Sequence, residues 1–195
     1  TFAGGLTNTG LPAGFKSTLS YDANGQLTSV MSGSTGSAPP QIAAGYLFSL
    51  ALKSDGTVWA WGWNGYGQLG ENNGPTTSIP AQAGGLDGVT AIAAGYYHSL
   101  ALKSDGTVWA WGDNSYGELG NGTTNSASMP EHVPNLSGVK AIAAGYGLSV
   151  ALKSDGTVWT WGYNNDGELG NNTTTASFVP VEVTGLTGVT AIGAA

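Results

Sequence analysis

The sequence predicts an all-β chain made of β-propeller blades, each with four short antiparallel strands. A twelve-residue segment, ALKSDGTVWAWG, occurs at residues 51–62, again at 101–112, and with one change at 151–162. Such a fixed spacing of about fifty residues is typical of solenoids and propellers, in which each unit buries its apolar face against its neighbours. The 33 glycines and the charged fraction of only 9% suit short strands joined by tight turns.

The N-terminal part of the chain does not follow the repeat. Residues 18–22 and 26–30 flank the turn sequence Ala-Asn-Gly and predict a hairpin, and the Ser-, Gly- and Pro-rich segment 31–40 predicts a linker. We therefore expect a divergent hairpin segment with its linker at residues 1–41, followed by the repeats at 42–195. The three full repeats are expected at 42–91, 92–141 and 142–191, and a fourth begins at 192.

Four strands are expected in each repeat. Alternation of apolar residues with small or polar ones predicts a strand at 48–53, and the Asp-Gly pair that follows predicts a tight turn. The next strand, 57–62, places Trp59 and Trp61 on one face. Further strands are expected at 92–95 and 129–133. We expect the paired tryptophans to pack between blades rather than to stack on a carbohydrate, because aromatic rings are how thin blades bury area.

Residues 91–124, AIAAGYYHSLALKSDGTVWAWGDNSYGELGNGTT, resemble a repeat of the regulator of chromosome condensation family. The resemblance rests on a G-x-x-H-[ST]-x-A-L strand, a DG turn, W-G-x-N and G-Q-L-G, and it covers residues 42–192. It implies a β-propeller, usually of seven blades. The Thr-, Asn- and Gly-rich loops are similar to those of bacterial secreted or surface members, which implies an extracellular or cell-surface location.

Charge and hydropathy exclude several classes of partner. The chain has five lysines, no arginine and a formal net charge of -7, and three of the lysines are the repeated hairpin residue. Since phosphate contacts come chiefly from clustered Lys and Arg, we expect no binding of nucleic acid. No window approaches the roughly 20 apolar residues needed to span a bilayer, so we expect no membrane insertion.

The residues give little support for catalysis. His98 and His132 occupy different positions of the repeat, and no nucleophile with a matching base stands out. We interpret His98 as a packed and hydrogen-bonded core imidazole. The acidic residues near Asp113 and Asp166 lack the spacing of a calcium loop. We therefore expect no enzyme activity, no cofactor and no metal site.

Residues that vary between the copies form the candidate binding surface. Loops on a rigid scaffold can change without disturbing the core, and mixtures of Tyr, Asn, Ser and Gly favour adaptable recognition. The alternative is ordinary variation of solvated turns. We predict a noncatalytic module that binds protein or glycan through its loop rim, with the candidate residues Trp63, Tyr66, Tyr96, Tyr97, Asp113, Tyr116, Tyr163 and Asp166.

A second hypothesis is a structural subunit that binds copies of itself. Three repeats do not close a ring of seven blades, and three arrangements would cover the open faces. The chain could be part of a longer array, which we expect of a natural gene product. Two chains could complete one ring, or a terminal strand could pair with the next subunit and extend a fibre. The candidate residues for this strand are Val189, Ala191 and Ile192.

Overall fold

The computed structural model describes residues 15–21, 27–34, 41–71 and 74–194, and the chain divides into two compact units, 1–37 and 38–195. In the first unit, strands β1 (Phe15–Tyr21) and β2 (Leu27–Ser34) pair as an antiparallel hairpin. This is the region where the sequence predicts a hairpin, and both strands are longer than predicted.

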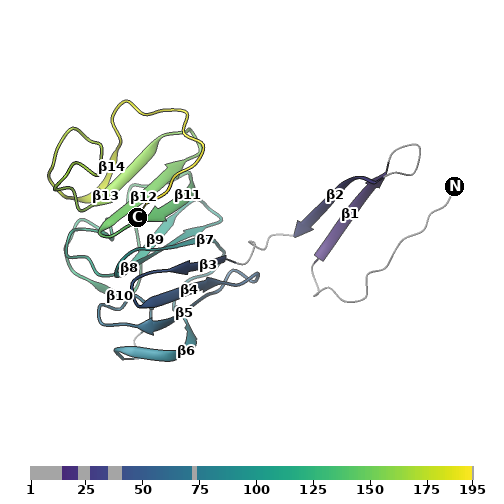
Figure 1. Cartoon of the computed structure of the whole chain (residues 1–195), viewed down its shortest axis with the longest axis horizontal. Coiled ribbons are helices and arrows are strands. Elements are labelled where there is room, and N and C mark those ends of the chain that lie inside the picture. Colours follow the sequence, from purple (N-terminus) through teal and green to yellow (C-terminus); the bar gives the residue numbers. More distant parts are fainter. Residues whose placement is uncertain (1–14, 22–26, 35–40, 72–73, 195) are drawn as a thin grey trace. The chain divides into compact units, whose positions relative to one another are not determined.

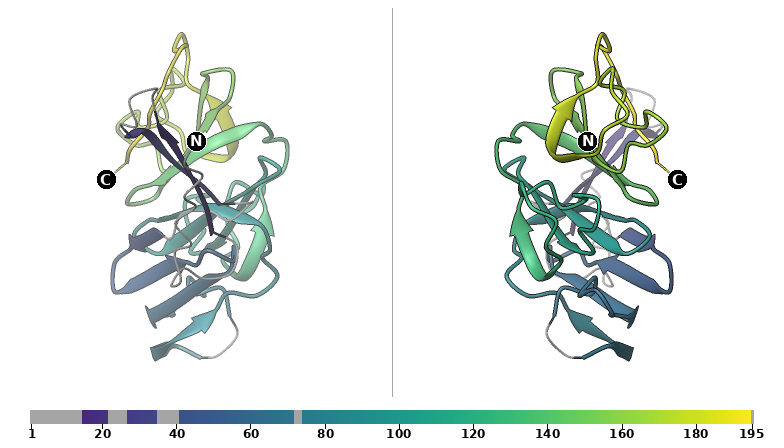
Figure 2. Two further views of the ribbon diagram at one scale, coloured as in Figure 1. Left: turned by 90° about the vertical axis from the view of Figure 1, so that its right-hand side faces the viewer. Right: turned by 90° about the vertical axis from the view of Figure 1, so that its left-hand side faces the viewer.

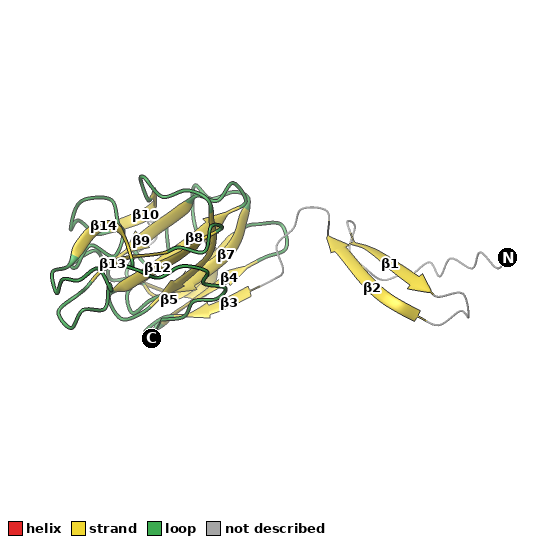
Figure 3. Ribbon diagram, turned by 90° about the horizontal axis from the view of Figure 1, so that it is seen from above, coloured by secondary structure: helices red, strands yellow, loops and turns green. Residues whose placement is uncertain are grey.

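The second unit consists of three four-stranded antiparallel sheets, which confirms the predicted fold class (Figure 1). Each sheet takes four consecutive strands of the chain. No helix occurs in the described ranges, so none there could cross a membrane (Figure 3). The strands are β3 (Gln41–Ala44), β4 (Phe48–Leu52), β5 (Val58–Trp63) and β6 (Thr76–Gln82); β7 (Val89–Ala94), β8 (His98–Lys103), β9 (Val108–Gly112) and β10 (Ala127–His132); and β11 (Val139–Ala144), β12 (Leu148–Lys153), β13 (Val158–Gly162) and β14 (Ser177–Glu182).

The three sheets follow one another in chain order as successive blades (Figure 2). The first strand of each blade lies at the inner edge of its sheet, and β7 contacts both β3 and β11 across the blade boundaries. The last strands, β6, β10 and β14, lie on the outer edges of their sheets. Pairing between the inner strands and the repeated hairpin keeps the same register in all three blades, for example Ile42 opposite Ala51 and Ile92 opposite Ala101.

The core lies between blades rather than within one. Ile92, Ala101 and Trp111 of the second blade pack into the hydrophobic cluster formed by the first blade. The third blade repeats this packing with Ala151 and Trp161 against the second. Each blade therefore offers one apolar face to the blade before it and the other to the blade after it, as expected for a repeat that cannot bury its core alone.

Two of the hydrogen bonds that cross each boundary recur at equivalent positions and share one acceptor. The carbonyl oxygen of Gln68 accepts from Trp111 Nε1 and from Ser99 Oγ, both at 2.8 Å. The next boundary repeats the arrangement fifty residues later, with the carbonyl oxygen of Glu118 as acceptor and distances of 2.7 Å from Trp161 Nε1 and 2.8 Å from Ser149 Oγ. Because these groups are buried, an unmade bond here costs about 1–3 kcal/mol.

The two tryptophans of each pair have different environments. Trp111 and Trp161 are fully buried between blades, as the sequence predicts. Trp109 and Trp159 are only half-buried, although they also pack against the inter-blade clusters. The ammonium group of the repeated lysine lies over the outer ring in each blade, at 5.1 to 5.4 Å from the centroid.

The segment 189–194 has no strand assignment. Val189 and Ile192 are half-buried against the hydrophobic cluster of the third blade, whereas Ala191 is exposed. The Val189 N–H donates to the carbonyl of Gly156 at 3.1 Å. This segment therefore packs where the inner strand of a following blade would begin, and its pairing with another chain stays a prediction.

Candidate functional site

The two ends of the blades differ in what they carry. We call one the hairpin end, where the DG turns at 53–57, 103–107 and 153–157 lie. The other is the loop end, where the turns after the inner strands meet the long loops after the third strands. The loop-end segments are 45–47, 63–71 with 74–75, 95–97, 113–126, 145–147 and 163–176. All eight candidate binding residues lie at this end.

A buried asparagine organises each long loop. Asn114 is fully buried, and its Oδ1 accepts from the Leu119 N–H at 2.9 Å. Its Nδ2 donates to the carbonyls of Thr123 and Asn125, both at 3.0 Å. Asn64 and Asn164 make the corresponding bonds in their loops. A side chain that satisfies the loop backbone in this way fixes the loop on the scaffold without regular secondary structure.

A glycine next to each tryptophan brings two loop-end segments together. Gly112 has φ of 106°, a conformation that L side chains rarely adopt, and a Cβ there would collide with the carbonyl oxygen of Tyr97. The Asp113 N–H donates to that same carbonyl at 2.9 Å. The glycine thus allows the loop after the third strand to lie directly against the turn after the inner strand.

Six aromatic rings gather at the loop end of the first two blades and the neighbouring edge of the third. Tyr46 and Tyr96 stack with centroids 4.3 Å apart and planes at 12°. Trp63, Tyr66 and Tyr97 contact one another, with ring centroids 5.0 to 5.5 Å apart. We call this set the aromatic cluster; its members are Tyr46, Trp63, Tyr66, Tyr96, Tyr97 and Tyr146.

The aromatic cluster is accessible from outside. Tyr46, Tyr66 and Tyr146 are exposed, Tyr146 to 59%. Burial and the neighbouring Tyr46 hydroxyl raise the pKa of Tyr96 to about 12, so its ring is neutral at physiological pH. The cluster therefore presents uncharged rings with hydroxyl groups, a surface that can make both apolar contacts and hydrogen bonds.

A second aromatic pair lies at the boundary of the second and third blades. Tyr116 and Tyr163 meet edge to face with centroids 5.0 Å apart. Gly147, which replaces Tyr97 of the previous repeat, leaves room for them, because a Cβ on it would lie 3.2 Å from Tyr163 and 3.4 Å from Tyr116. The buried carboxylate of Glu118 lies beside the same position.

The two candidate acids occupy positions that are aromatic in other copies. Asp113 Oδ1 accepts from the Ser115 hydroxyl at 2.7 Å and from the Ser126 hydroxyl at 3.4 Å. Asp166 is exposed, and its N–H donates to Glu168 Oε2 at 3.0 Å. Neither is in the aromatic cluster, but both lie in loop-end segments.

The structure thus brings four of the predicted residues, Trp63, Tyr66, Tyr96 and Tyr97, into one cluster and two more into a separate pair. Sequence reasoning missed Tyr46 and Tyr146 as candidates. Both occupy the same repeat position as Tyr96, which is among the candidates, and this position is tyrosine in every copy. Their recurrence beside variable residues is the signal that would have identified them.

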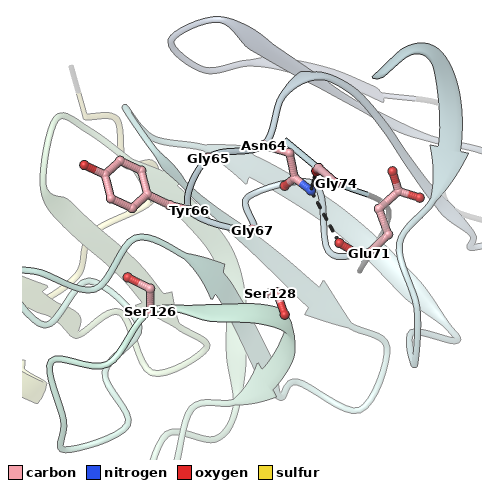
Figure 4. Close-up of a pocket in the computed structure, with 8 residues that line it drawn as sticks. All are labelled: Asn64, Gly65, Tyr66, Gly67, Glu71, Gly74, Ser126 and Ser128. Atoms are coloured by element: carbon pink, nitrogen blue, oxygen red, sulfur yellow. Dashed lines mark hydrogen bonds between the residues drawn. The ribbon is translucent and has the colours of Figure 1, made fainter. Parts of the chain in front are cut away.

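A polar hollow of about 390 Å³ lies beside Tyr66 (Figure 4). It is lined by the long loop of the first blade and by Ser126 and Ser128 of the second. Asn64 Nδ2 donates to the carbonyl of Glu71 across its wall at 3.4 Å. The loop end therefore combines an aromatic surface with an adjoining polar recess.

His98 lies below this surface in the core. It is 1% exposed, and its Nε2 lies 3.0 Å from Ser149 Oγ, so the prediction of a packed and hydrogen-bonded imidazole is confirmed. Burial lowers its pKa to about 4, so the ring is neutral near pH 7. Within the described ranges, no group of three or more His, Cys, Asp or Glu side chains could hold a metal ion.

Solved structures share this fold. Yeast RCC1 (Prp20), in a structure with Kap60, superimposes with a TM-score of 0.68 at 26% identity over 80% of this chain. Human WBSCR16 gives 0.66 at 27% identity over 79% of this chain. A further structure of Prp20p from Saccharomyces cerevisiae, described with its binding to Gsp1p and histones, gives 0.65 at 26% identity over 74%. The chain spans only 38 to 40% of the length of these proteins.

The sequence comparisons agree with the structural ones. The ultraviolet-B receptor UVR8 of Arabidopsis thaliana is 43% identical over 42 residues, which are 22% of this chain and 10% of the receptor. Two models of the regulator of chromosome condensation (RCC1) repeat match, one at residues 41–68, 89–118 and 139–168 and the other at 55–102, 105–152 and 155–195. The second model covers most of the chain, and the chain therefore belongs to the regulator of chromosome condensation (RCC1) repeat family.

Proposed function

We propose that this chain is a noncatalytic extracellular module that binds a protein or a glycan through the loop end of its blades. The observation that carries the proposal is the convergence of four predicted binding residues, Trp63, Tyr66, Tyr96 and Tyr97, in one accessible cluster. Exposed aromatic rings on a rigid scaffold supply contact area at low entropic cost and are enriched at binding hot spots.

The comparisons support binding to a protein. RCC1-like propellers typically bind proteins, and their repeats generally act as binding or regulatory modules. Yeast RCC1 has been solved bound to Kap60, and the same yeast protein is described as binding Gsp1p and histones. Since the chain spans about two-fifths of these proteins, a particular partner does not carry over from them.

The experiment is capture of surface proteins and glycans by the immobilised full chain, compared with two variants. Tyr66→Ala removes an exposed ring from the aromatic cluster, and Lys53→Ala removes an exposed side chain at the hairpin end. We expect Tyr66→Ala to lose at least half of the captured ligand and Lys53→Ala to retain it. Equal loss by both variants, or by neither, would contradict a binding site at the loop end.

The extracellular location needs its own measurement. An antibody against the full chain, applied to intact cells of the source organism, should label them or the culture medium without permeabilisation. Labelling only after permeabilisation would contradict this part of the proposal.

A second candidate function is self-assembly through open blade faces. The equivalent isoleucines favour it, because Ile92 is 8% exposed between blades whereas Ile42, at the same position of the first blade, is 72% exposed. The first blade also has the side-chain donors for an inter-blade contact. Within the described ranges, Trp61 and Ser49 make no bonds equivalent to those that Trp111 and Ser99 donate to the blade before them. A second copy that presents the carbonyl of its Glu168 would match this face.

A further inference from the structure

Charge is segregated between the two ends of the blades. The four lysines of the described blades all lie at or next to the hairpin end, at positions 53, 103, 140 and 153. The loop end holds five acidic residues and, among the described residues, no lysine: Glu71, Asp113, Glu118, Asp166 and Glu168. Glu71 and Glu118 are buried, so Asp113, Asp166 and Glu168 supply the accessible negative charge. Because the chain has no arginine, the loop end is acidic as well as aromatic.

Acids and rings alternate at two equivalent positions of the repeat. The residue after each Trp-Gly pair is Trp63, Asp113 or Tyr163. Three residues further on, the series is Tyr66, Tyr116 and Asp166. Each blade therefore carries at least one aromatic ring here, and the second and third blades each carry a ring and a carboxylate three residues apart in the same loop. A cation that lies between such a ring and carboxylate is attracted by both, and the two attractions act together.

At the hairpin end, the chain itself supplies the cation that lies over each ring and pairs with a carboxylate. Trp59, Trp109 and Trp159 each have a lysine ammonium over the ring. An aspartate pairs with each of these lysines, Asp55 at 3.6 Å and Asp155 at 3.8 Å in the first and third blades, and Asp87 in the second. No such cation covers the loop-end rings within the described part of the chain, so a partner would have to supply it.

Asp113 is held in place for such a contact. The Ser115 N–H and hydroxyl and the Ser126 hydroxyl all bond its Oδ1. The side chain is half-exposed beside the loop that carries Tyr116. A carboxylate whose orientation is fixed by neighbouring hydrogen bonds loses little entropy when it pairs with an incoming cation.

We infer that the loop end binds a basic segment of a protein, with Lys or Arg side chains lying against the tyrosines and pairing with Asp113 and Asp166. This inference rests on the proposed function and narrows it, since a neutral glycan would use the rings and leave the carboxylates unused. The aromatic contacts would supply affinity, and the carboxylates would select a cationic partner over a neutral one.

The test is the affinity of the full chain for two labelled peptides, measured by fluorescence anisotropy. One is acetyl-Gly-Arg-Gly-Lys-Gly-Arg-Gly amide, and the other carries citrulline and acetyl-lysine at the same positions, which removes the charge and keeps the shape. We expect the basic peptide to bind at least about tenfold more tightly at low salt, with the difference shrinking as salt is added.

Two variants with the same change in net charge locate the site. Asp113→Asn with Asp166→Asn removes two charges from the loop end, and Asp55→Asn with Asp155→Asn removes two from the hairpin end. We expect the first to weaken binding of the basic peptide by about fivefold or more and the second by less than about twofold, because an exposed pair remote from the site contributes little. Equal weakening by both variants would show only general attraction to an acidic chain and would overturn the inference.

The remaining outcomes separate this inference from the proposed function. No binding of the basic peptide overturns the inference. Equal binding of both peptides, abolished by Tyr66→Ala, also overturns it but leaves the loop end as a binding surface for neutral ligands. Binding of the basic peptide that neither Tyr66→Ala nor the loop-end double variant changes would contradict a loop-end site altogether.

Discussion

Glu118 occupies a repeat position that is buried in the first two blades and exposed in the third. The side chain at this position accepts a hydrogen bond from the backbone N–H two residues earlier in all three blades, where the residue is Gln68, Glu118 or Glu168. Glu118 is 2% exposed, Gln68 is fully buried, and Glu168 is exposed. Burial raises the pKa of Glu118 to about 7, since the charged form loses its hydration, and the charge of Asp113 also raises it.

Glu118→Gln should therefore change the pH dependence of stability. Between pH 4.5 and about 7 the folded chain holds a proton on Glu118 that the unfolded chain has released, so the free energy of unfolding falls as pH rises through this window. As pH rises from 4.5 to 8, the free energy of unfolding of the variant should increase by about 1–3 kcal/mol relative to that of the native chain. Urea unfolding across this range measures the slope.

The slope is the informative quantity because the amide brings a cost of its own. Gln68 Nε2 is buried without a hydrogen-bond partner among the described residues, and the amide introduced by Glu118→Gln could carry the same penalty at every pH. Glu168→Gln, at the exposed equivalent, is the control and should leave the slope unchanged. A constant offset between native chain and Glu118→Gln, with parallel curves, would contradict the role assigned to burial.

His98 acts in the opposite direction at acidic pH. Its folded pKa is about 4, below the ordinary value of 6.5, so the unfolded chain binds a proton that the folded chain does not, and stability is lost as pH falls through this window. His98→Phe copies Phe48 of the first blade. When the pH falls from 7 to 4.5, the free energy of unfolding of this variant should fall by about 2 kcal/mol less than that of the native chain. Thermal unfolding at both pH values tests this, with His132→Phe at an exposed position as the control. The same acid sensitivity in both variants would refute it.

At the scale of elements, the bond from Trp111 Nε1 to the Gln68 carbonyl joins two sheets that share no strand pairing. Trp111→Phe removes this buried donor and part of the ring volume. We expect a loss of about 2–3 kcal/mol in the free energy of unfolding by urea. Trp61→Phe, at the equivalent half-exposed position, should cost less than about 1 kcal/mol. Similar costs for the two variants would mean that the inter-blade bond adds little.

The strands were predictable because their signals are local. Alternating residues and an Asp-Gly turn set β4 and β5, and the observed bounds differ from the prediction by one residue at most ends. The different environments of the two tryptophans in each pair were not predictable. Trp111 is enclosed and Trp109 lies under a lysine only because the blades stack on one another. The aromatic cluster has the same origin: Tyr46 and Tyr96 are fifty residues apart and meet only because the blades stack in register.

At the scale of the whole molecule, the burial of one isoleucine of the repeat shows whether another blade packs against that face. Ile92 is buried between the first two blades, Ile142 packs against the second cluster and Ile192 against the third, whereas Ile42 is exposed. The loop-end binding proposal leaves Ile42 in solvent or against further blades, and the self-assembly proposal places it against another copy. The two proposals thus differ in the mass of the chain in solution.

Ile42→Asp tests self-assembly through this face. If copies associate there, light scattering of the native chain should show a mass that rises with concentration, and the aspartate should return it to a monomer, because a charge buried against the apolar face of another blade has no partner to offset its desolvation. Ile79→Asp is the matched control, since Ile79 is 74% exposed on the outer strand β6, close to the 72% of Ile42, and should keep the native mass at every concentration. A native chain that stays monomeric throughout, or equal dissociation by both variants, would exclude the blade face as an assembly surface and leave the loop end as the site through which this molecule meets a partner.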